Sequence, residues 1–261
     1  MERPRVLLVD DDPLSLQVSR AYLESAGYVV TTRSESIGTS AVIFRERPDI
    51  VVLDVNMPGL RGDQLAEVVL RNGTAHRPAL VLYSMLPEIE LRDLAARCGA
   101  AGYLSKQARA TELVRFLSSL LRTTRSAPAP SADGNVSIRP TIDGDVLDMS
   151  AIEEIAALEN PDRPGVLREL VESFLIETDR HQRGIEQSLN QSNAEGVRSQ
   201  AHQINGSSRH LGAKRLAEVC AEIESLAKAG NLDAARNRMP ALRRQVERAR
   251  TALLALVPGP R

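Results

Sequence analysis

Acidic residues follow two short apolar runs in the first half of the chain. Asp10, Asp11 and Asp12 come directly after one run, and Asp54 comes directly after another. If both runs are parallel strands, their carboxyl ends meet at one edge of a sheet and bring these side chains together. Neighbouring carboxylates repel one another unless a cation neutralises them, and carboxylate oxygens suit Mg²⁺. The sequence therefore predicts an acidic site that binds a metal ion.

Asp54 has the chemistry of a nucleophile toward phosphorus, because a carboxylate can form an acyl phosphate. Phosphoryl transfer depends mainly on positioning and on neutralising the charge of the transferred oxygens. Ser84 ends a later apolar run and Lys106 follows the next one. The hydroxyl can hydrogen-bond one phosphoryl oxygen, and the ammonium can neutralise another. These residue types predict a site for phosphoryl transfer.

Short apolar runs alternate with longer amphipathic stretches up to about residue 122, which is typical of a parallel sheet covered by helices. The predicted strands are residues 6–9, 29–32, 50–53, 80–83 and 102–104. The predicted helices are residues 13–26, 35–45, 63–70, 87–98 and 109–121. This order predicts an α/β doubly wound, five-stranded parallel sheet whose ligands gather at the carboxyl ends of the strands. Asp12 is expected to cap the first helix rather than to bind a metal ion.

Strand-like alternation is absent from the second half of the chain, which has a helical pattern with short breaks. Residues 125–144 are rich in Pro, Ser, Gly and Asp and are expected to form an extended linker. Short connections between amphipathic helices favour antiparallel neighbours. We therefore expect a domain at residues 1–124 and an all-α, up-and-down four-helix bundle with a short leading helix at residues 145–257.

One histidine of the helical half has a suggestive neighbourhood, the sequence AHQINGSSRHLGA around His202. An inward stripe passes beside it, formed by Val197, Ala201, Ile204, Ser208 and Leu211. The face that includes His202 also holds Arg198, Asn205, Gly206 and Arg209. Glycine costs a helix about 1 kcal/mol relative to alanine, but it leaves room for a partner to approach the imidazole. The arginines could attract an acidic pocket or phosphoryl oxygens, whereas a lone helical histidine is more often an ordinary boundary residue.

The segments VLLVDDD, VLDVNMPG, LVLYS and GYLSK resemble, in order and spacing, the motifs of bacterial response-regulator receiver domains. The resemblance implies a flavodoxin-like fold in which Asp54 is the phosphoacceptor and Ser84 and Lys106 assist it. It further implies a switch formed by Ser84 and Tyr103. The implied Mg²⁺ site comprises the acidic pair Asp10 and Asp11, with Asp11 and Asp54 as direct ligands and Asn56 as a ligand through its backbone carbonyl. Gln107 departs from the pattern, because the family usually has proline after the lysine.

Residues 147–254 resemble the histidine phosphotransfer (HPt) family, on the motif around His202 and on the segments LREL..SFL and LAEVCAEIE. The resemblance implies that His202 is a phosphoacceptor and that Arg198, Asn205, Gly206 and Arg209 dock a receiver. Asn205 stands where the family commonly has lysine. We predict that Arg209 replaces the missing charge.

The two resemblances together imply a two-component phosphorelay protein whose partners are a sensor histidine kinase and receiver-domain proteins. The receiver is expected to catalyse its own phosphoryl transfer and hydrolysis, without an ATP-binding kinase domain, because the sequence lacks a glycine-rich phosphate loop. Two alternatives stay open. The helical domain could be a protein-binding or RNA-binding output, or the first domain could be an Asp-nucleophile phosphatase, although Asn56 stands where those enzymes have a second acid.

The composition of the chain bears on its partners, its location and the state of its cysteines. The 33 basic and 34 acidic residues give a net charge of -1, which offers no broad attraction to nucleic acid or anionic lipid. The chain has no apolar window long enough for membrane insertion and no signal-peptide pattern, so we expect a cytoplasmic location. We expect Cys98 and Cys220 to be reduced core residues. Ordinary roles are predicted for the other histidines, with His76 in a loop, His181 on an exposed stretch and His210 at a helix end.

Overall fold

The structure is a computed structural model that describes residues 3–35, 38–57, 77–108, 110–124, 146–159 and 164–257. The predicted helix at residues 63–70, the predicted linker at residues 125–144 and His76 lie outside the described residues. None of the described helices combines the length and the apolar composition that crossing a membrane requires.

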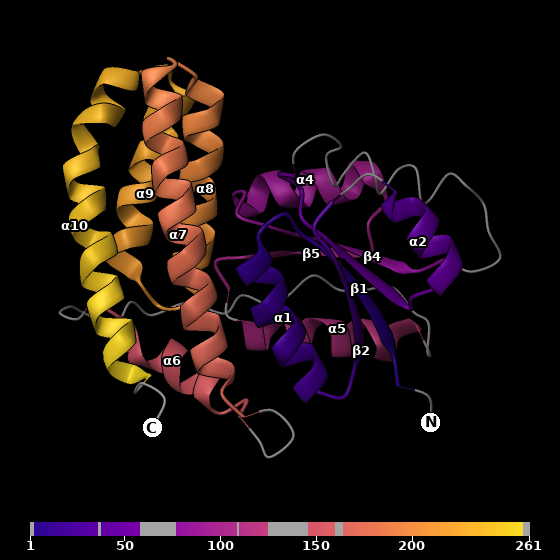
Figure 1. Cartoon of the computed structure of the whole chain (residues 1–261). Coiled ribbons are helices and arrows are strands. Elements are labelled where there is room, and N and C mark those ends of the chain that lie inside the picture. The colour runs from indigo at the N-terminus through magenta and orange to yellow at the C-terminus, as the bar shows by residue number, and fades with distance from the viewer. Residues whose placement is uncertain are drawn as a thin grey trace.

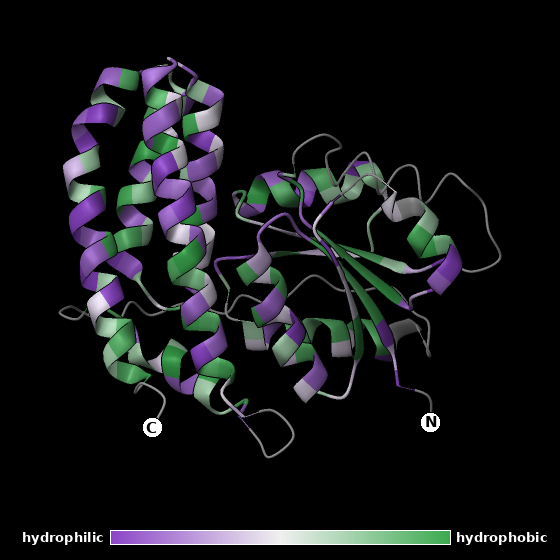
Figure 2. Ribbon diagram, in the orientation of Figure 1, coloured by the Kyte–Doolittle hydropathy of each residue, from purple (hydrophilic) through white to green (hydrophobic). Residues whose placement is uncertain are grey.

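The first half of the chain forms a five-stranded parallel sheet in the order β2-β1-β3-β4-β5. Its strands are β1 (Arg5–Val9), β2 (Val29–Arg33), β3 (Ile50–Leu53), β4 (Ala79–Ser84) and β5 (Gly102–Ser105). The strands consist largely of Val, Ile and Leu, and Figure 2 shows the centre of the sheet as hydrophobic. Branched apolar side chains suit strands that are covered on both faces. The predicted doubly wound sheet is therefore confirmed.

Helices cover both faces of this sheet, as Figure 1 shows. They are α1 (Pro13–Ser25), α2 (Thr39–Glu46), α4 (Glu88–Cys98) and α5 (Ala110–Thr124). Because successive strand residues point to opposite faces, Leu7 and Val9 pack on the side of α2 and α4, whereas Val6 and Leu8 pack on the side of α1 and α5. The two cores fix the strands in register, and that register sets where their carboxyl ends lie.

The second half of the chain is a helical bundle. It comprises the short α6 (Met149–Ala156) and four longer helices, α7 (Val166–Asn190), α8 (Ala194–His210), α9 (Lys214–Lys228) and α10 (Leu232–Leu256). Each long helix contacts the next along the chain, and α10 also contacts α7. The stripe predicted along α8 from Val197 to Leu211 is fully buried. The predicted bundle and its short leading helix are confirmed.

Three predictions about single residues have clear outcomes. Cys98 and Cys220 are buried and free, as expected. Asp12 caps α1 by accepting a hydrogen bond from the backbone N–H of Leu14, so its predicted capping role is confirmed. The prediction that His181 is exposed is wrong. Its side chain is buried, and its Nδ1 lies 2.7 Å from the Gln200 side-chain oxygen. His181 lies on the side of α7 that faces the interior of the bundle, although its neighbours in the sequence are charged.

The sheet domain and the bundle share a hydrophobic cluster. The outer side of α1 contributes Leu14, Val18, Ala21 and Tyr22 to the same buried cluster as the core of the bundle. Helix α1 contacts both α7 and α8, and Figure 1 shows the bundle standing beside α1. The two halves therefore pack through apolar side chains, which brings one side of α8 to the edge of the sheet.

Candidate functional site

The register of the two central strands places Asp10 and Asp54 side by side. Val9 pairs with Leu53, so the residue that follows each strand stands at the same level of the sheet. The backbone N–H of Asp54 donates to the carbonyl of Val9 over 2.8 Å, which continues the strand pairing into the site. Both carboxylates are buried. Local strand pairing therefore forces two acids together, as the sequence predicted.

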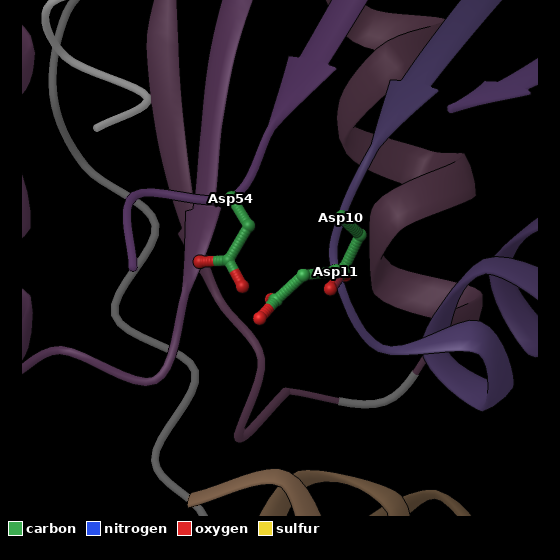
Figure 3. A group of neighbouring side chains, drawn as sticks. All are labelled: Asp10, Asp11 and Asp54. Carbon is green, nitrogen blue, oxygen red and sulfur yellow. The ribbon is translucent and has the colours of Figure 1, made fainter. Parts of the chain in front are cut away.

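Asp11 completes a group of three carboxylates. One carboxylate oxygen from each of Asp10, Asp11 and Asp54 lies within 4.8 Å of the others, and Figure 3 shows the three side chains gathered between the ends of β1 and β3. Burial and the charges of Asp54 and Asp10 raise the pKa of Asp11 to about 6. This mutual repulsion is the condition that a bound cation relieves, and hard oxygen donors are the ligands that Mg²⁺ prefers.

Lys106 supplies a buried positive charge to the same group. Its Nζ lies 2.6 Å from Asp10 Oδ2 and 2.7 Å from Asp54 Oδ2. Burial would lower the pKa of Lys106, but the two carboxylates outweigh burial and raise it. Burial would likewise raise the pKa of Asp54, but the charge of Lys106 outweighs burial and lowers that pKa. At Asp10 burial is the larger effect, so the pKa of Asp10 is raised. Lys106 thus favours the ionised form of Asp54, which a nucleophile requires.

Ser84 and Asn56 border Asp54 on its other side. The backbone N–H of Asn56 donates to Asp54 Oδ1 over 3.1 Å, and the Asn56 amide donates to the Ser84 hydroxyl over 3.5 Å. Ser84 is fully buried at the end of β4. Tyr103 is half-buried and packs against the core beneath α4. The structure thus brings Ser84, Asn56 and Lys106 to Asp54, and places Tyr103 on β5 at the α4 side of the sheet.

His202 projects from α8 and pairs with an acid on α9. Its Nδ1 lies 2.9 Å from Glu224 Oε1. Burial would lower the pKa of His202, but the hydrogen bond and the charge of Glu224 outweigh it and raise that pKa. Burial would raise the pKa of Glu224, but hydrogen bonding and charge from His202 lower it. An ionised carboxylate only accepts hydrogen bonds, so Nδ1 carries the proton and a neutral ring has its lone pair at Nε2.

The predicted docking residues do not all make the contacts that their charges suggested. Arg198 binds Glu195 on its own helix, at distances of 2.9 and 2.5 Å. Arg209 Nε donates to Asn205 Oδ1 over 3.0 Å, and a hydrogen bond from Asn205 helps to lower the pKa of Glu224. Arg209 therefore contacts Asn205, and Asn205 in turn contacts the acid that holds His202.

The side of α8 that carries His202 meets the acidic edge of the sheet. The Gln203 amide donates to Asp11 Oδ2 over 2.7 Å. A Cβ atom added at Gly206 would lie 3.6 Å from Asp12 Oδ2, which is an ordinary contact distance. A longer side chain at this position would therefore have to displace the capping carboxylate. The two sites that the sequence predicted separately are brought together by these contacts.

Three contributors to the site were missed by sequence reasoning. Ser15 donates to Asp10 Oδ2 over 2.6 Å, Gln203 reaches Asp11, and Glu224 holds His202. Ser15 and Gln203 carry no local signal, because their partners are set by tertiary packing. Glu224 has a weak signal, since it lies one turn after Cys220 beside the buried stripe of α9 and places a carboxylate next to apolar residues.

Comparison with known proteins agrees with this division of the chain. Residues 6–118 match the family model for the response regulator receiver domain, and residues 169–252 match the model for the Hpt domain. The chain is 28% identical over 258 residues to the sensory/regulatory protein RpfC of Xanthomonas campestris pv. campestris, covering 98% of this chain and 35% of that protein. It is 25% identical over 230 residues to the sensor protein GacS of Pseudomonas syringae pv. syringae, covering 86% of this chain and 25% of that protein.

Among solved structures, the chemotaxis protein CheY4 of Vibrio cholerae is similar at 25% identity and a TM-score of 0.43, covering 46% of this chain and 99% of that one. The chain spans about a third of RpfC and a quarter of GacS. Two family models match in the same order as the two folded parts. The chain therefore joins a response regulator receiver domain to an Hpt domain.

Proposed function

We propose that this chain is a phosphorelay protein in which Asp54 and His202 are the phosphoacceptors. The observation that carries the proposal is the buried Lys106 ammonium, which contacts Asp10 and Asp54 together at the ends of the strands. A group so placed keeps Asp54 ionised and offers positive charge to an arriving phosphoryl group. The match to a receiver domain supports the same assignment.

At the receiver site, Asp54 attacks phosphorus and forms an acyl phosphate. Lys106 neutralises one phosphoryl oxygen and Ser84 donates a hydrogen bond to another. The side chains of Asp10, Asp11 and Asp54 gather around a single ammonium, so this set of oxygen donors suits a divalent cation. Asp10, Asp11 and Asp54 would hold Mg²⁺ together with the Asn56 carbonyl, and the ion would neutralise charge on the phosphoryl oxygens. A shift of Ser84 and Tyr103 on phosphorylation remains part of this proposal.

At the bundle site, the phosphoryl group is carried on Nε2 of His202. Glu224 keeps the proton on Nδ1, so the ring leaves as a neutral imidazole when the nitrogen–phosphorus bond breaks. Asn205 supports the charge of Glu224 through a hydrogen bond, and Arg209 in turn donates to Asn205. This arrangement favours phosphotransfer over a purely binding role for the bundle, because a binding surface has no need of an oriented imidazole.

The partners that this chemistry requires carry phosphohistidine or an acceptor aspartate. We propose a sensor histidine kinase as the donor and receiver-domain proteins as further partners. The similarity to proteins named as a sensor and as a sensory/regulatory protein supports this class of partner.

The proposal is tested by mixing a phosphorylated histidine kinase with the wild-type, Asp54→Asn and His202→Gln chains and following radioactive phosphate. On the separated band of this chain, base-labile acyl phosphate should disappear with Asp54→Asn, and acid-labile but base-stable phosphohistidine should disappear with His202→Gln. Undiminished labelling of both kinds in both variants would refute the assignment. Circular dichroism of each variant controls for folding.

A further inference from the structure

We propose that Gln203 of the bundle is a further residue of the receiver's metal site, so that Mg²⁺ binding and docking of the bundle on the receiver strengthen each other. The proposal rests on the proposed function, since it takes the three carboxylates to be the Mg²⁺ site. It extends that function by assigning part of the ion's surroundings to the second domain. The ion then regulates how firmly the two domains pack.

Helix α8 has a polar side that is buried. Ala201 and Ile204 of its apolar stripe face the core of the bundle. Gln203 and Ser207 lie one turn apart on the side turned away from that stripe, yet Gln203 is 8% exposed and Ser207 is 3% exposed. A helix side that points away from its own bundle is exposed unless another element covers it. The receiver is the cover, because α1 contacts α8 and Asp11 contacts Gln203.

The small neighbours of Gln203 let α8 approach the acidic edge closely. A Cβ atom added at Gly206 would lie 3.6 Å from Asp12 Oδ2, so the backbone of α8 stands almost against that carboxylate. The Ser207 hydroxyl donates to the carbonyl oxygen of Gln203 over 2.8 Å, which satisfies it within α8. Gln203 is therefore a long side chain between small ones, and it extends to the carboxylates of the receiver.

The Gln203 amide is hydrogen-bonded at one end. Nε2 donates to Asp11 Oδ2 over 2.7 Å, whereas Oε1 is buried and has no hydrogen-bond partner among the residues that the structure describes. A buried amide oxygen without a donor is destabilising, and native proteins satisfy nearly all such atoms. The unpaired oxygen belongs to an amide that already contacts the acidic group, so its donor has to be supplied beside that group.

A hydrated divalent cation supplies such a donor. Mg²⁺ usually keeps several waters when it binds one or two protein carboxylates, and these waters can bridge to nearby oxygens. Lys106 contacts Asp10 and Asp54, whereas Asp11 contacts the neutral Gln203 amide. The oxygens of the three carboxylates lie within 4.8 Å of one another, so an ion shared by them is close to the same amide. Oε1 would then accept a hydrogen bond from the ion's hydration shell while Nε2 keeps its bond to Asp11.

The consequence is a reciprocal coupling between the ion and the domain contact. If Mg²⁺ binds more tightly when α8 is docked, α8 docks more tightly when Mg²⁺ is bound, and by the same factor. One net hydrogen bond corresponds to a factor of about five. Ion binding therefore holds the bundle on the receiver, and release of the ion loosens it.

The coupling is measured on the full chain with MgCl₂ alone, in the absence of a phosphoryl donor. Backbone amide resonances of the receiver, followed by NMR as MgCl₂ is added, give the affinity for the ion. Gln203→Met keeps the length of the side chain and removes its donor and its acceptor, so it should bind Mg²⁺ about fivefold more weakly. Gln187→Met makes the same change at an exposed position of α7 and should bind Mg²⁺ as wild type does.

A second variant tests the same coupling from the receiver side. Val18 of α1 is buried in the cluster shared with the bundle, so Val18→Gln should undock the bundle without adding a charge near the ion. A larger radius of gyration in small-angle X-ray scattering would verify the undocking. Val18→Gln should bind Mg²⁺ about fivefold more weakly than wild type, and adding Gln203→Met to it should have no further effect.

The outcomes separate this proposal from the proposed function. Equal Mg²⁺ affinity of wild type and Gln203→Met would mean that an ordinary water satisfies Oε1. Tighter binding by Gln203→Met would mean that the amide competes with the ion. Either result would overturn the coupling and leave the carboxylate site intact. The phosphoacceptors are tested separately, because labelling of Asp54 and His202 by a phosphorylated kinase does not depend on the sign of this coupling.

Discussion

The two proposed phosphoacceptor sites are built with opposite charges around the reacting group. Asp54 sits among other carboxylates and is paired with a buried ammonium, Lys106. His202 is paired with a carboxylate, Glu224. A carboxylate nucleophile has to be kept ionised while its target brings more negative charge, so it needs cations. An imidazole has to keep a proton on one nitrogen while the other reacts, so it needs an acid.

Each site therefore supplies the charge that the other site lacks. The receiver offers the positive charge of Lys106 and three carboxylates that would hold a divalent cation, whereas the bundle offers an oriented nitrogen on a ring that is bonded to an acid. A phosphoryl group between them would be neutralised from the receiver side and released from the bundle side. Substitutions that remove one charge at a time should abolish this complementarity at a single site.

The largest effect is expected from Lys106→Met. The change leaves Asp10 and Asp54 buried without their shared cation, so the free energy of unfolding should fall by about 3 kcal/mol in the absence of metal. Labelling of Asp54 by acetyl phosphate should be lost as well. Urea denaturation and label incorporation measure the two effects. Lys214→Met is the control, because its ion pair with Asp148 is largely exposed and should contribute about 1 kcal/mol or less. Equal losses in the two variants would contradict the special role of Lys106.

A smaller effect is expected from Glu224→Gln, which keeps the shape of the side chain and removes its charge. The pKa of His202 should fall, as followed by NMR titration of the ring, and transfer through His202 should slow by about tenfold. Glu222→Gln is the matched control on the same helix, since Glu222 pairs with Arg238 on the outside of the bundle.

The same pair predicts a pH window for stability. The pKa of Glu224 is lowered from 4.5, so its contribution is present above that value and is lost as pH falls through the folded-state pKa. The pKa of His202 is raised from 6.5, so its contribution is present below that value and is lost as pH rises through the folded-state pKa. The stability difference between wild type and Glu224→Gln should therefore peak between these two ordinary values. A difference that grows toward alkaline pH would count against the pair.

The smallest effect is expected from Asp148→Asn, which tests a carboxylate remote from the reacting groups. Hydrogen bonds from Lys214 and Ser150 lower the pKa of Asp148 to about 2. Its contribution is present above the ordinary value near 3.8 and is lost as pH falls through about 2. The variant should lose about 0.5 kcal/mol at neutral pH, with unchanged labelling of Asp54 and His202. A loss of labelling would mean that the sites depend on more than their own charges.

The sequence predicted the parts of each site that depend on one element or on neighbouring strands. Asp10, Asp54, Ser84 and Lys106 all follow or end strands of one parallel sheet, so strand order alone brings them together. His202 was predicted from the sequence around it on a single helix and from the resemblance of that sequence to the HPt family. Gln203 and Glu224 were not found, because their roles depend on how α8 meets the receiver and α9. A local sequence pattern does not specify which side chains of two packed helices will form a hydrogen bond with each other. The same limit explains His181, whose inward position was hidden by the charged residues around it.

The most direct test of the complementary sites is to supply acetyl phosphate to the wild-type and Asp54→Asn chains and to quantify phosphohistidine at His202. Because we expect acetyl phosphate to react at Asp54, we predict label on His202 in the wild-type chain and none in the Asp54→Asn chain. Equal labelling of His202 in both chains, or labelled Asp54 that never passes its phosphoryl group to His202, would contradict the account.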